Sequence, residues 1–173
     1  MLHRIVITGA ESTGKTTFAQ TLANHYSEPW TEEFVRKYVD QIDRELQPKD
    51  LEPIANGQLA IEDAMLEKAE KLIVHDTNIL SSIIYAKHYF DTEFNWVNRR
   101  FKERDYSLYL FCTPDIPWKS DPGQRESPLA RTQLHQIFKT RLKSLKLPYL
   151  EIQGTNKQRF ERAVTAIDKL IEH

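Results

Sequence analysis

Eight residues near the N-terminus carry the most specific chemistry in this sequence. Residues Gly9–Thr16, which read GAESTGKT, fit the pattern G-x-x-x-x-G-K-[ST]. Glycines let a loop turn tightly, so that several backbone N–H groups converge on the oxygens of a triphosphate. The lysine of such a loop reaches the β- and γ-phosphates, and the hydroxyl that follows binds Mg²⁺. The pattern therefore predicts a site for a nucleoside triphosphate, with ATP and Mg²⁺ as the expected ligands.

The expected contacts with ATP come from this loop, from the residue after it and from one distant arginine. They are Gly9, Glu11, Ser12, Thr13, Gly14, Lys15, Thr16, Thr17 and Arg131. Glu11 must direct its carboxylate away from the phosphates, because both groups are negatively charged. Lys15 is also a catalytic candidate, since it reaches the phosphoryl group that is transferred.

An acidic residue that follows a second apolar run is the expected partner of the metal. Asp76 comes directly after residues 71–75, whose sequence KLIVH predicts a buried strand. An acid at the end of a neighbouring strand holds Mg²⁺ in phosphate-loop proteins, so Thr16 and Asp76 are the predicted metal-binding residues. Asp76 is also suited to cap a helix that starts at Thr77, because Asp is a favoured N-cap residue. The sequence is compatible with both roles.

Residues that could receive or transfer a phosphoryl group lie elsewhere in the chain. Glu33 falls at the expected end of a short strand and is a candidate base, or else an exposed acid favoured by a helix start. Residues 114–128 predict a loop that contains Arg125, and Arg131 follows it. Arginine suits the dispersed charge of a phosphoryl group, and solvated surface charge is the alternative for both arginines. The catalytic candidates are therefore Lys15, Glu33, Asp76 and Arg125.

Strands and helices are expected to alternate along the chain and to position these residues. The expected strands span residues 4–8, 27–31, 71–75, 106–112 and 148–153. The expected helices span 32–43, 50–70, 95–104, 131–145 and 156–171, and two more begin near Lys15 and Thr77. This alternation predicts the three-layer α/β fold of P-loop NTPases, a mostly parallel five-stranded sheet with helices on both faces. We expect one domain, residues 1–173, with a lid segment at about 114–145.

Composition argues against several classes of protein. The chain has 24 Lys and Arg against 25 Asp and Glu, so no net field attracts nucleic acid or an acidic membrane. Cys112 is the single cysteine, which precludes an internal disulfide and fits a reducing compartment. No signal peptide is expected, and no apolar run approaches the roughly 20 residues that span a membrane. We expect a cytoplasmic domain with a small-molecule partner, and the sequence leaves its oligomeric state open.

The classes of nucleotide-binding protein that remain differ in what happens to the γ-phosphate. A GTPase switch would carry D-x-x-G and N-K-x-D, whereas this chain has DTNI at 76–79 and NKQR at 156–159. An AAA-type motor needs a helical subdomain, for which this chain is too short. A small-molecule kinase fits best, and an ATP-binding regulatory module without a small acceptor is the alternative. Phosphorylation of a nucleic-acid 5′-hydroxyl is disfavoured by the balanced charge, although residues 131–146 are basic.

Several motifs together resemble the ribosylnicotinamide kinase domain of the NadR family, a P-loop group also classed with AAA-type ATPase-like domains. Residues Gly9–Thr16 are similar to that family's G-x-E-S-[ST]-G-K-[ST], and Glu33–Arg36, EFVR, resembles its E-[YF]-x-R. The further matches gain weight from their order and spacing, and they are Gly57-Gln58, Asp76-Thr77, residues 116–125, and residues 148–154 with Arg159 beyond. The resemblance covers nearly the whole chain.

The resemblance implies transfer of the γ-phosphate of ATP to the 5′-hydroxyl of nicotinamide riboside. It implies that Asp76 lies between metal and acceptor, that Glu33 and Arg36 line the acceptor side, and that Arg125 acts from the lid. Trp30 or Trp118 would stack on the positively charged nicotinamide ring, or else serve in ordinary packing. The implied substrate-binding residues are Trp30, Glu33, Arg36, Asp76, Asn78 and Trp118.

Three departures from the family pattern leave the identity of the acceptor open. Asn78 stands where the family often has an acid, and residues 121–125 are one residue longer than the usual D-G-x-R. The helix before Asp76 offers Ala and Ile at 60–64 where the family can have a second aromatic wall. A similar nucleoside is therefore as compatible with these motifs as nicotinamide riboside.

Overall fold

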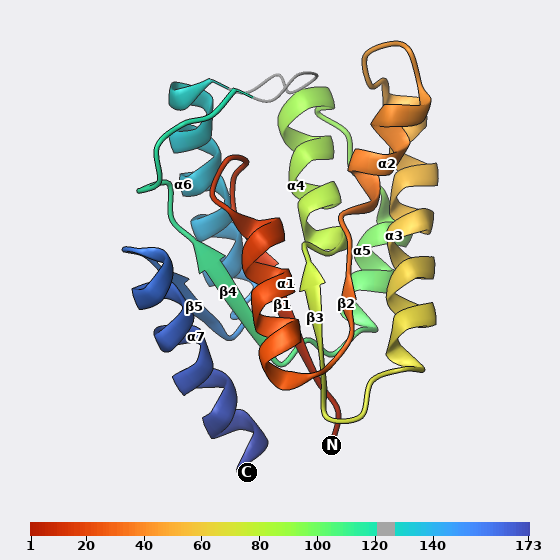
Figure 1. Cartoon of the computed structure of the whole chain (residues 1–173). Coiled ribbons are helices and arrows are strands. Elements are labelled where there is room, and N and C mark those ends of the chain that lie inside the picture. The colour runs from red at the N-terminus through yellow and green to blue at the C-terminus, as the bar shows by residue number, and fades with distance from the viewer. Residues whose placement is uncertain (121–126) are drawn as a thin grey trace.

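The protein has an α/β fold built on a five-stranded sheet in which the strand pairings are all parallel (Figure 1). The structure, a computed structural model, describes residues 1–120 and 127–173. The strands lie in the order β2 (Trp30–Thr31), β3 (Leu72–Asp76), β1 (His3–Thr8), β4 (Leu108–Cys112) and β5 (Tyr149–Ile152). Parallel neighbours require long crossover connections, which is why helices alternate with strands. The fold expected from the sequence is confirmed.

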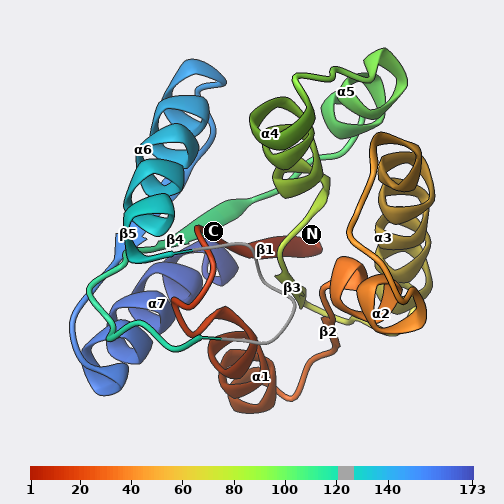
Figure 2. The ribbon, with the colours of Figure 1, turned by 90° about the horizontal axis from the view of Figure 1, so that it is seen from above.

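Helices cover both faces of the sheet and complete three layers (Figure 2). One face carries α1 (Lys15–Tyr26) and α7 (Asn156–Ile171). The other carries α3 (Leu51–Leu66), α4 (Ile79–Phe90), α5 (Asn95–Lys102) and α6 (Pro128–Ser144). The short helix α2 (Phe34–Gln41) packs on α3, which a 3₁₀ turn at Pro48–Asp50 precedes. In the part of the chain that the structure describes, no helix has the length and apolarity that crossing a membrane demands.

The alternation of side chains along β1 divides the core between the two faces. Ile5 and Ile7 pack with α1 and α7, while Val6 between them packs with the helices of the opposite face. Successive side chains of a strand point to opposite faces, so a strand covered on both sides needs an apolar residue at each position. All three side chains are fully buried. This double burial holds β1 at the centre of the sheet and anchors the loop that follows it.

The start of α6 differs from the sequence expectation for a local reason. The helix begins at Pro128 instead of Arg131. Ser127 precedes it, and the Ser127 hydroxyl accepts the backbone N–H of Ala130 at 3.1 Å. Proline is favoured in the first helical turn because its missing N–H would have no partner there. Serine as the N-cap and proline after it therefore extend the helix towards the N-terminus.

Part of the segment expected as a lid is packed into the core. Leu134, Phe138 and Leu142 of α6 are fully buried, and Phe138 and Leu142 belong to the core cluster on that face of the sheet. Residues 121–126 of the same segment lie outside the described residues. The helical part of the expected lid is therefore packed as part of the hydrophobic core.

The close approach of α2 to α3 depends on Gly57. A Cβ built at this position would lie 2.2 Å from two carbons of the Phe34 ring. The neighbouring Gln58 accepts the backbone N–H of Phe34 through Oε1 at 3.0 Å. Gly57 and Gln58 thereby dock the first turn of α2 on α3, and Glu33 is the residue directly before that turn.

Candidate functional site

The loop between β1 and α1 has a backbone that requires glycine at two positions. Gly9 has φ 135° and Gly14 has φ 77°. A Cβ on Gly9 would lie 2.7 Å from the carbonyl oxygen of Cys112, so glycine lets the loop pass over the end of β4. Because α1 begins at Lys15, its unpaired N–H groups and the positive end of its dipole face the loop. This is the geometry of an anion-binding loop.

Lys15 and Thr13 close this loop on itself. The ammonium of Lys15 donates to the carbonyl oxygen of Ala10 at 2.9 Å, and the hydroxyl of Thr13 donates to the same oxygen at 2.7 Å. Lys15 is 9% exposed, so its charge is largely removed from water and is stabilised by nearby anions. The ammonium opposes the rise in pKa that burial causes at Glu33 and Asp76.

Asp76 ends β3 beside the loop and contacts Thr16. The Thr16 hydroxyl donates to Oδ2 of Asp76 at 2.5 Å. The other carboxylate oxygen, Oδ1, is buried and has no hydrogen-bond partner among residues 1–120 and 127–173. Mg²⁺ prefers oxygen ligands and usually takes one or two from protein, with phosphate oxygens and waters completing its octahedron. Thr16 and Asp76 therefore fit a magnesium ion that is bound together with a nucleotide.

The structure separates Asp76 from the cap of the helix that follows. That helix, α4, begins at Ile79, and its N-cap is Asn78, whose side-chain oxygen accepts the N–H of Leu80 at 3.2 Å. The interpretation of Asp76 as an N-cap is therefore wrong. The amide of Asn78 also donates to the hydroxyl of Tyr109 at 3.0 Å, and the residue is 1% exposed. Both ends of the Asn78 amide are thus hydrogen-bonded within the protein, and the residue also lines a cavity bounded by α2, α3 and α4.

Two cavities adjoin each other around the loop and the first turn of α2. The smaller, of about 270 Å³, is lined by residues 11–17 of the loop and α1 and by Lys119 and Ser120. The larger, of about 370 Å³, is lined by side chains of α2, α3 and α4. Glu11, Glu33 and Arg36 line both cavities. Two ligands, one in each cavity, would meet at these residues.

Glu33 is the extended residue directly before α2. Burial raises the pKa of Glu33, and the charge of Asp76 adds to the rise, whereas Lys15 and Arg36 oppose it. Burial also raises the pKa of Asp76. Two carboxyls with raised pKa values and two cations thus act on one another in one small region. Such clusters are typical of sites where protons are transferred.

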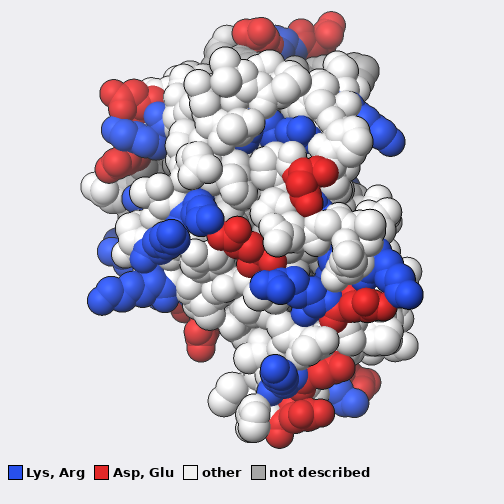
Figure 3. Space-filling model, turned by 90° about the vertical axis from the view of Figure 1, so that its left-hand side faces the viewer, with Lys and Arg blue, Asp and Glu red and all other residues white. Residues whose placement is uncertain are grey.

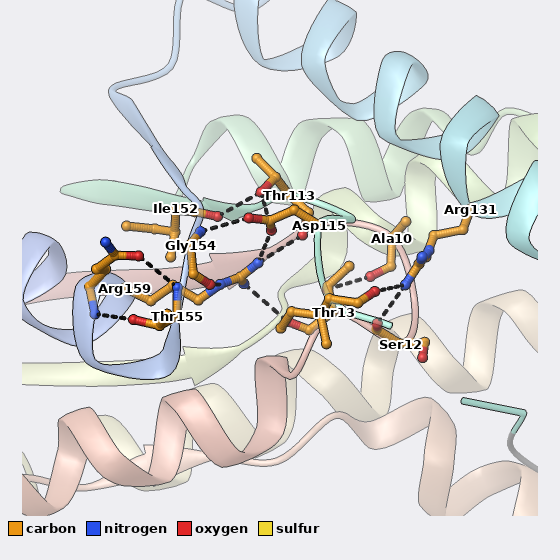
Figure 4. Close-up of polar contacts among 12 residues, drawn as sticks. Ala10, Ser12, Thr13, Thr113, Asp115, Arg131, Ile152, Gly154, Thr155 and Arg159 are labelled. Atoms are coloured by element: carbon orange, nitrogen blue, oxygen red, sulfur yellow. Dashed lines mark hydrogen bonds and ion pairs between the residues drawn. The ribbon is translucent and has the colours of Figure 1, made fainter. Parts of the chain in front are cut away.

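Several expected residues lie away from these cavities. Trp30 packs against the buried cluster that joins α1, α7 and β1, and it lines neither cavity. Trp118 also lines neither, and its ring centroid lies 5.6 Å from the guanidinium carbon of Arg131. Arg131 donates to the carbonyl oxygen of Ser12 (Figure 4) and to that of Ile116. Arg125 lies outside the described residues.

The larger cavity also contains aromatic side chains that the sequence reasoning missed. Tyr85 and Tyr89 of α4 line it, and their rings stack with centroids 5.8 Å apart and planes inclined by 10°. Their spacing of four residues on a helix that follows Asp76 was the available signal.

Two buried polar side chains in the same cavity were missed as well. Gln58 and Ser81 line it, and Gln58 Nε2 and Ser81 Oγ have no hydrogen-bond partner within the described ranges. Because Oε1 of Gln58 is engaged by the N–H of Phe34, the amide must offer its donors elsewhere. Gln58 and Ser81 are therefore candidate hydrogen-bonding residues for a polar ligand.

Comparison with known families and proteins agrees with this architecture. A family model described as "AAA domain" matches residues 4–159. The chain is 26% identical over 179 residues to the trifunctional NAD biosynthesis/regulator protein NadR of Escherichia coli (strain K12). That alignment covers 98% of this chain and 43% of the relative, so the chain spans less than half of the relative's length.

Two solved structures share the fold over almost the whole chain. A NadR protein in complex with NAD and AMP-PNP matches with a TM-score of 0.84 at 20% identity, and a NadR protein in complex with NR matches with a TM-score of 0.82 at 19% identity. Each match covers 99% of this chain and 50% of the solved chain. At these identities the likeness shows the fold.

Proposed function

The chain belongs to the AAA domain family, and from this premise we propose that it is a NadR-like kinase that transfers the γ-phosphate of ATP to nicotinamide riboside or a similar nucleoside. The observation that carries the proposal is the junction of the two cavities at Glu11, Glu33 and Arg36. A transfer reaction needs the acceptor hydroxyl to approach the γ-phosphorus in line. A regulatory ATPase needs only the cavity around the loop, so the second, adjoining cavity favours a kinase.

In this proposal the loop residues bind the phosphates of ATP. The N–H groups at the start of α1 and the ammonium of Lys15 neutralise the phosphate oxygens. Thr16 and Asp76 would hold the magnesium ion, which supplies further positive charge at the β- and γ-phosphates. The unpartnered Oδ1 of Asp76 supports this assignment.

We assign the base to Glu33 because of its position between the cavities. Glu33 lines both of them, whereas Asp76 lines neither and is engaged by Thr16. The acceptor hydroxyl gives its proton to a carboxylate oxygen of Glu33 while its own oxygen bonds to the γ-phosphorus. The bond from that phosphorus to ADP breaks in the same step.

The larger cavity suits a heteroaromatic riboside. The stacked rings of Tyr85 and Tyr89 offer π-faces, which attract a positively charged ring such as nicotinamide. The amide donors of Gln58 suit a carbonyl oxygen. A volume of about 370 Å³ lies within the range of small-molecule sites. Nicotinamide riboside combines the cation, the carboxamide and the hydroxyls that these groups would bind.

A long nucleic acid is a poorer acceptor for this surface. The face that carries α6 and α7 mixes Lys and Arg with Asp and Glu (Figure 3). Lys139 of the basic helix α6 forms an ion pair with Glu151 at 2.6 Å, so its charge is partly neutralised and adds little to a basic surface. This mixture supports a small acceptor over a polyanion.

The test is ADP release from Mg-ATP with and without nicotinamide riboside, in wild type and in two variants. Glu33→Gln keeps the size of the side chain but cannot accept the proton, and we expect kcat to fall by about 10²–10⁴-fold. Glu32→Gln is the matched control, because Glu32 is half-exposed and pairs with Lys37 at 2.7 Å. Equal losses in both variants would remove Glu33 as the base. ATP binding without stimulation by any nucleoside would favour the ATP-binding regulatory module.

A further inference from the structure

Two buried arginines from different helices bind consecutive carbonyl groups of the phosphate loop. Arg131 of α6 donates through Nη1 to Ser12 O at 3.1 Å, and Arg159 of α7 donates through Nη1 to Thr13 O at 3.3 Å (Figure 4). Arg131 is 8% exposed and Arg159 is 3% exposed. Guanidinium groups are rarely buried this deeply without a specific partner, and these two use backbone carbonyls.

Arg159 is fixed by its remaining hydrogen bonds. Its Nε donates to Gly154 O at 3.1 Å, its Nη2 donates to Thr113 O at 3.0 Å, and the same nitrogen forms an ion pair with Asp115. Asp115 is held in turn, because its Oδ2 accepts the N–H of Gly154 at 2.6 Å and its Oδ1 accepts the hydroxyl of Thr113 at 2.7 Å. The guanidinium therefore ties the phosphate loop to the ends of β4 and β5.

Holding a carbonyl also orients the N–H of the next residue. The C=O and N–H of a trans peptide are coplanar and point in opposite directions. Fixing Ser12 O and Thr13 O therefore fixes the directions of the N–H groups of Thr13 and Gly14. Both residues line the loop cavity, whereas neither arginine does. Because the carbonyls point towards the arginines, the two N–H groups point away from them.

We propose that Arg159, assisted by Arg131, is a positioning residue that pre-orients the Thr13 and Gly14 amides of the phosphate loop for polyphosphate binding. Pre-orientation matters because donors that already point at the ligand need no reorganisation when it binds. The inference rests on the proposed function only in taking the ligand of the loop to be a polyphosphate. It adds a role to Arg159, which the sequence motifs did not explain.

The test uses Arg159→Lys, which keeps the charge but cannot span the carbonyls and the carboxylate that the guanidinium fork reaches. Arg162→Lys is the matched control, since Arg162 lies on the same helix, is exposed and donates through Nε to Glu151 O at 3.0 Å. The probe is inorganic tripolyphosphate with Mg²⁺, which needs neither adenosine nor an acceptor. We expect Arg159→Lys to weaken its binding about tenfold or more and the control to change it less than twofold.

A spectroscopic readout separates positioning from general stability. The chain has five glycines, so ¹⁵N-glycine labelling gives a spectrum simple enough to follow the Gly14 amide. Tripolyphosphate should shift this signal downfield in wild type and in Arg162→Lys, and much less in the folded fraction of Arg159→Lys. A merely structural role would lower the melting temperature and leave the ligand-induced shift unchanged, which would overturn the proposal.

A second variant keeps the test decisive if Arg159→Lys does not fold. Arg131→Lys removes the guanidinium that binds Ser12 O and Ile116 O and leaves the contacts of Arg159 in place. We expect it to weaken tripolyphosphate binding and to reduce the ligand-induced shift of the Thr13 amide, which ¹⁵N-threonine labelling follows. Unchanged binding and an unchanged Thr13 shift would then overturn the proposal. If wild type binds tripolyphosphate with these shifts but phosphorylates no nucleoside, the proposed function fails while the positioning role stands.

Discussion

Replacing Gly57 by Ala tests whether the close contact of α2 with α3 positions the proposed base. The added Cβ would lie 2.2 Å from Cε1 and Cζ of Phe34. Comfortable carbon–carbon contacts are about 3.5–4.0 Å, so the ring must move by roughly 1 Å or more. Glu33 directly precedes Phe34, whose N–H is bound to Gln58. A shift of the first turn of α2 therefore carries the carboxylate of Glu33 with it.

Two opposing effects of Gly57→Ala act on stability, and a third acts on catalysis. Alanine favours a helix over glycine by about 1 kcal/mol, whereas overpacking costs about 1–3 kcal/mol. The free energy of unfolding should therefore fall by about 1 kcal/mol. Misplacement of a catalytic group by about 1 Å costs about 10²-fold, so kcat should fall far more than stability suggests. The KM for ATP should change little, because the phosphate loop is not displaced.

Urea unfolding and steady-state kinetics measure these effects, and a double variant provides the control. In Gly57→Ala/Phe34→Ala the ring that clashes is absent, so α2 can settle on α3 again and kcat should recover by about tenfold or more. A wild-type kcat in Gly57→Ala would refute the reasoning. So would a double variant that is no more active than the single one.

Two further predictions concern charged groups. Lys15→Ala should lower kcat by about 100-fold or more, while the circular dichroism spectrum and the melting temperature stay near those of wild type. Lys37→Ala, at an exposed lysine, is the control. Near-normal turnover in Lys15→Ala would contradict the site assignment. Burial raises the pKa of Glu62 to about 7, against the opposing hydrogen bond from Tyr106, so the folded chain binds this proton more tightly than the unfolded chain does. The free energy of unfolding of wild type, relative to that of Glu62→Gln, should therefore fall by on the order of 3 kcal/mol as pH rises from about 4.5 through 7. If urea unfolding gave the same difference between the two proteins at each pH, the raised pKa of Glu62 would be contradicted.

The layered fold was predictable because its signals are local. Residues 4–8 and 71–75 are short apolar runs that end at a glycine and at an acid, and they become the central strands β1 and β3. Helix α7 spans Asn156–Ile171 as expected, since Thr155 and Gln158 form a capping box at its start. Hydrophobic periodicity and caps are read within a few residues, so no knowledge of distant contacts was needed.

The walls of the acceptor cavity were harder to predict because they depend on long-range packing. Trp30 and Trp118 were the predicted aromatic contacts, yet Trp30 is partly buried against the core cluster of α1 and α7 and Trp118 lies beside Arg131. Tyr85 and Tyr89 line the cavity because α4 follows β3, and the end of β3 lies beside the phosphate loop. The sequence shows that the two tyrosines lie one helical turn apart, but it does not show which face of α4 borders the cavity.

The contacts of Arg131 and Arg159 with the loop backbone were not predictable, although the sequence motifs included both arginines. Arg159 is 146 residues from Thr13, and the contact joins a side chain to a backbone carbonyl. Any residue at position 13 supplies such a carbonyl, so residue identity carries no signal. The cap of α4 was open for another reason: Asp and Asn are both favoured N-cap residues, and only the start of the helix at Ile79 decides that Asn78 is the cap.

The central claim is phosphoryl transfer to a nucleoside, and following the phosphate itself tests it most directly. The protein is incubated with Mg²⁺, nicotinamide riboside and ATP whose γ-phosphate carries ¹⁸O in its three terminal oxygens, and the products are analysed by mass spectrometry. We expect a nicotinamide mononucleotide that retains all three labelled oxygens, formed by wild type and not by Lys15→Ala. Labelled inorganic phosphate with unchanged riboside, and no phosphorylated product from any other nucleoside offered, would contradict it.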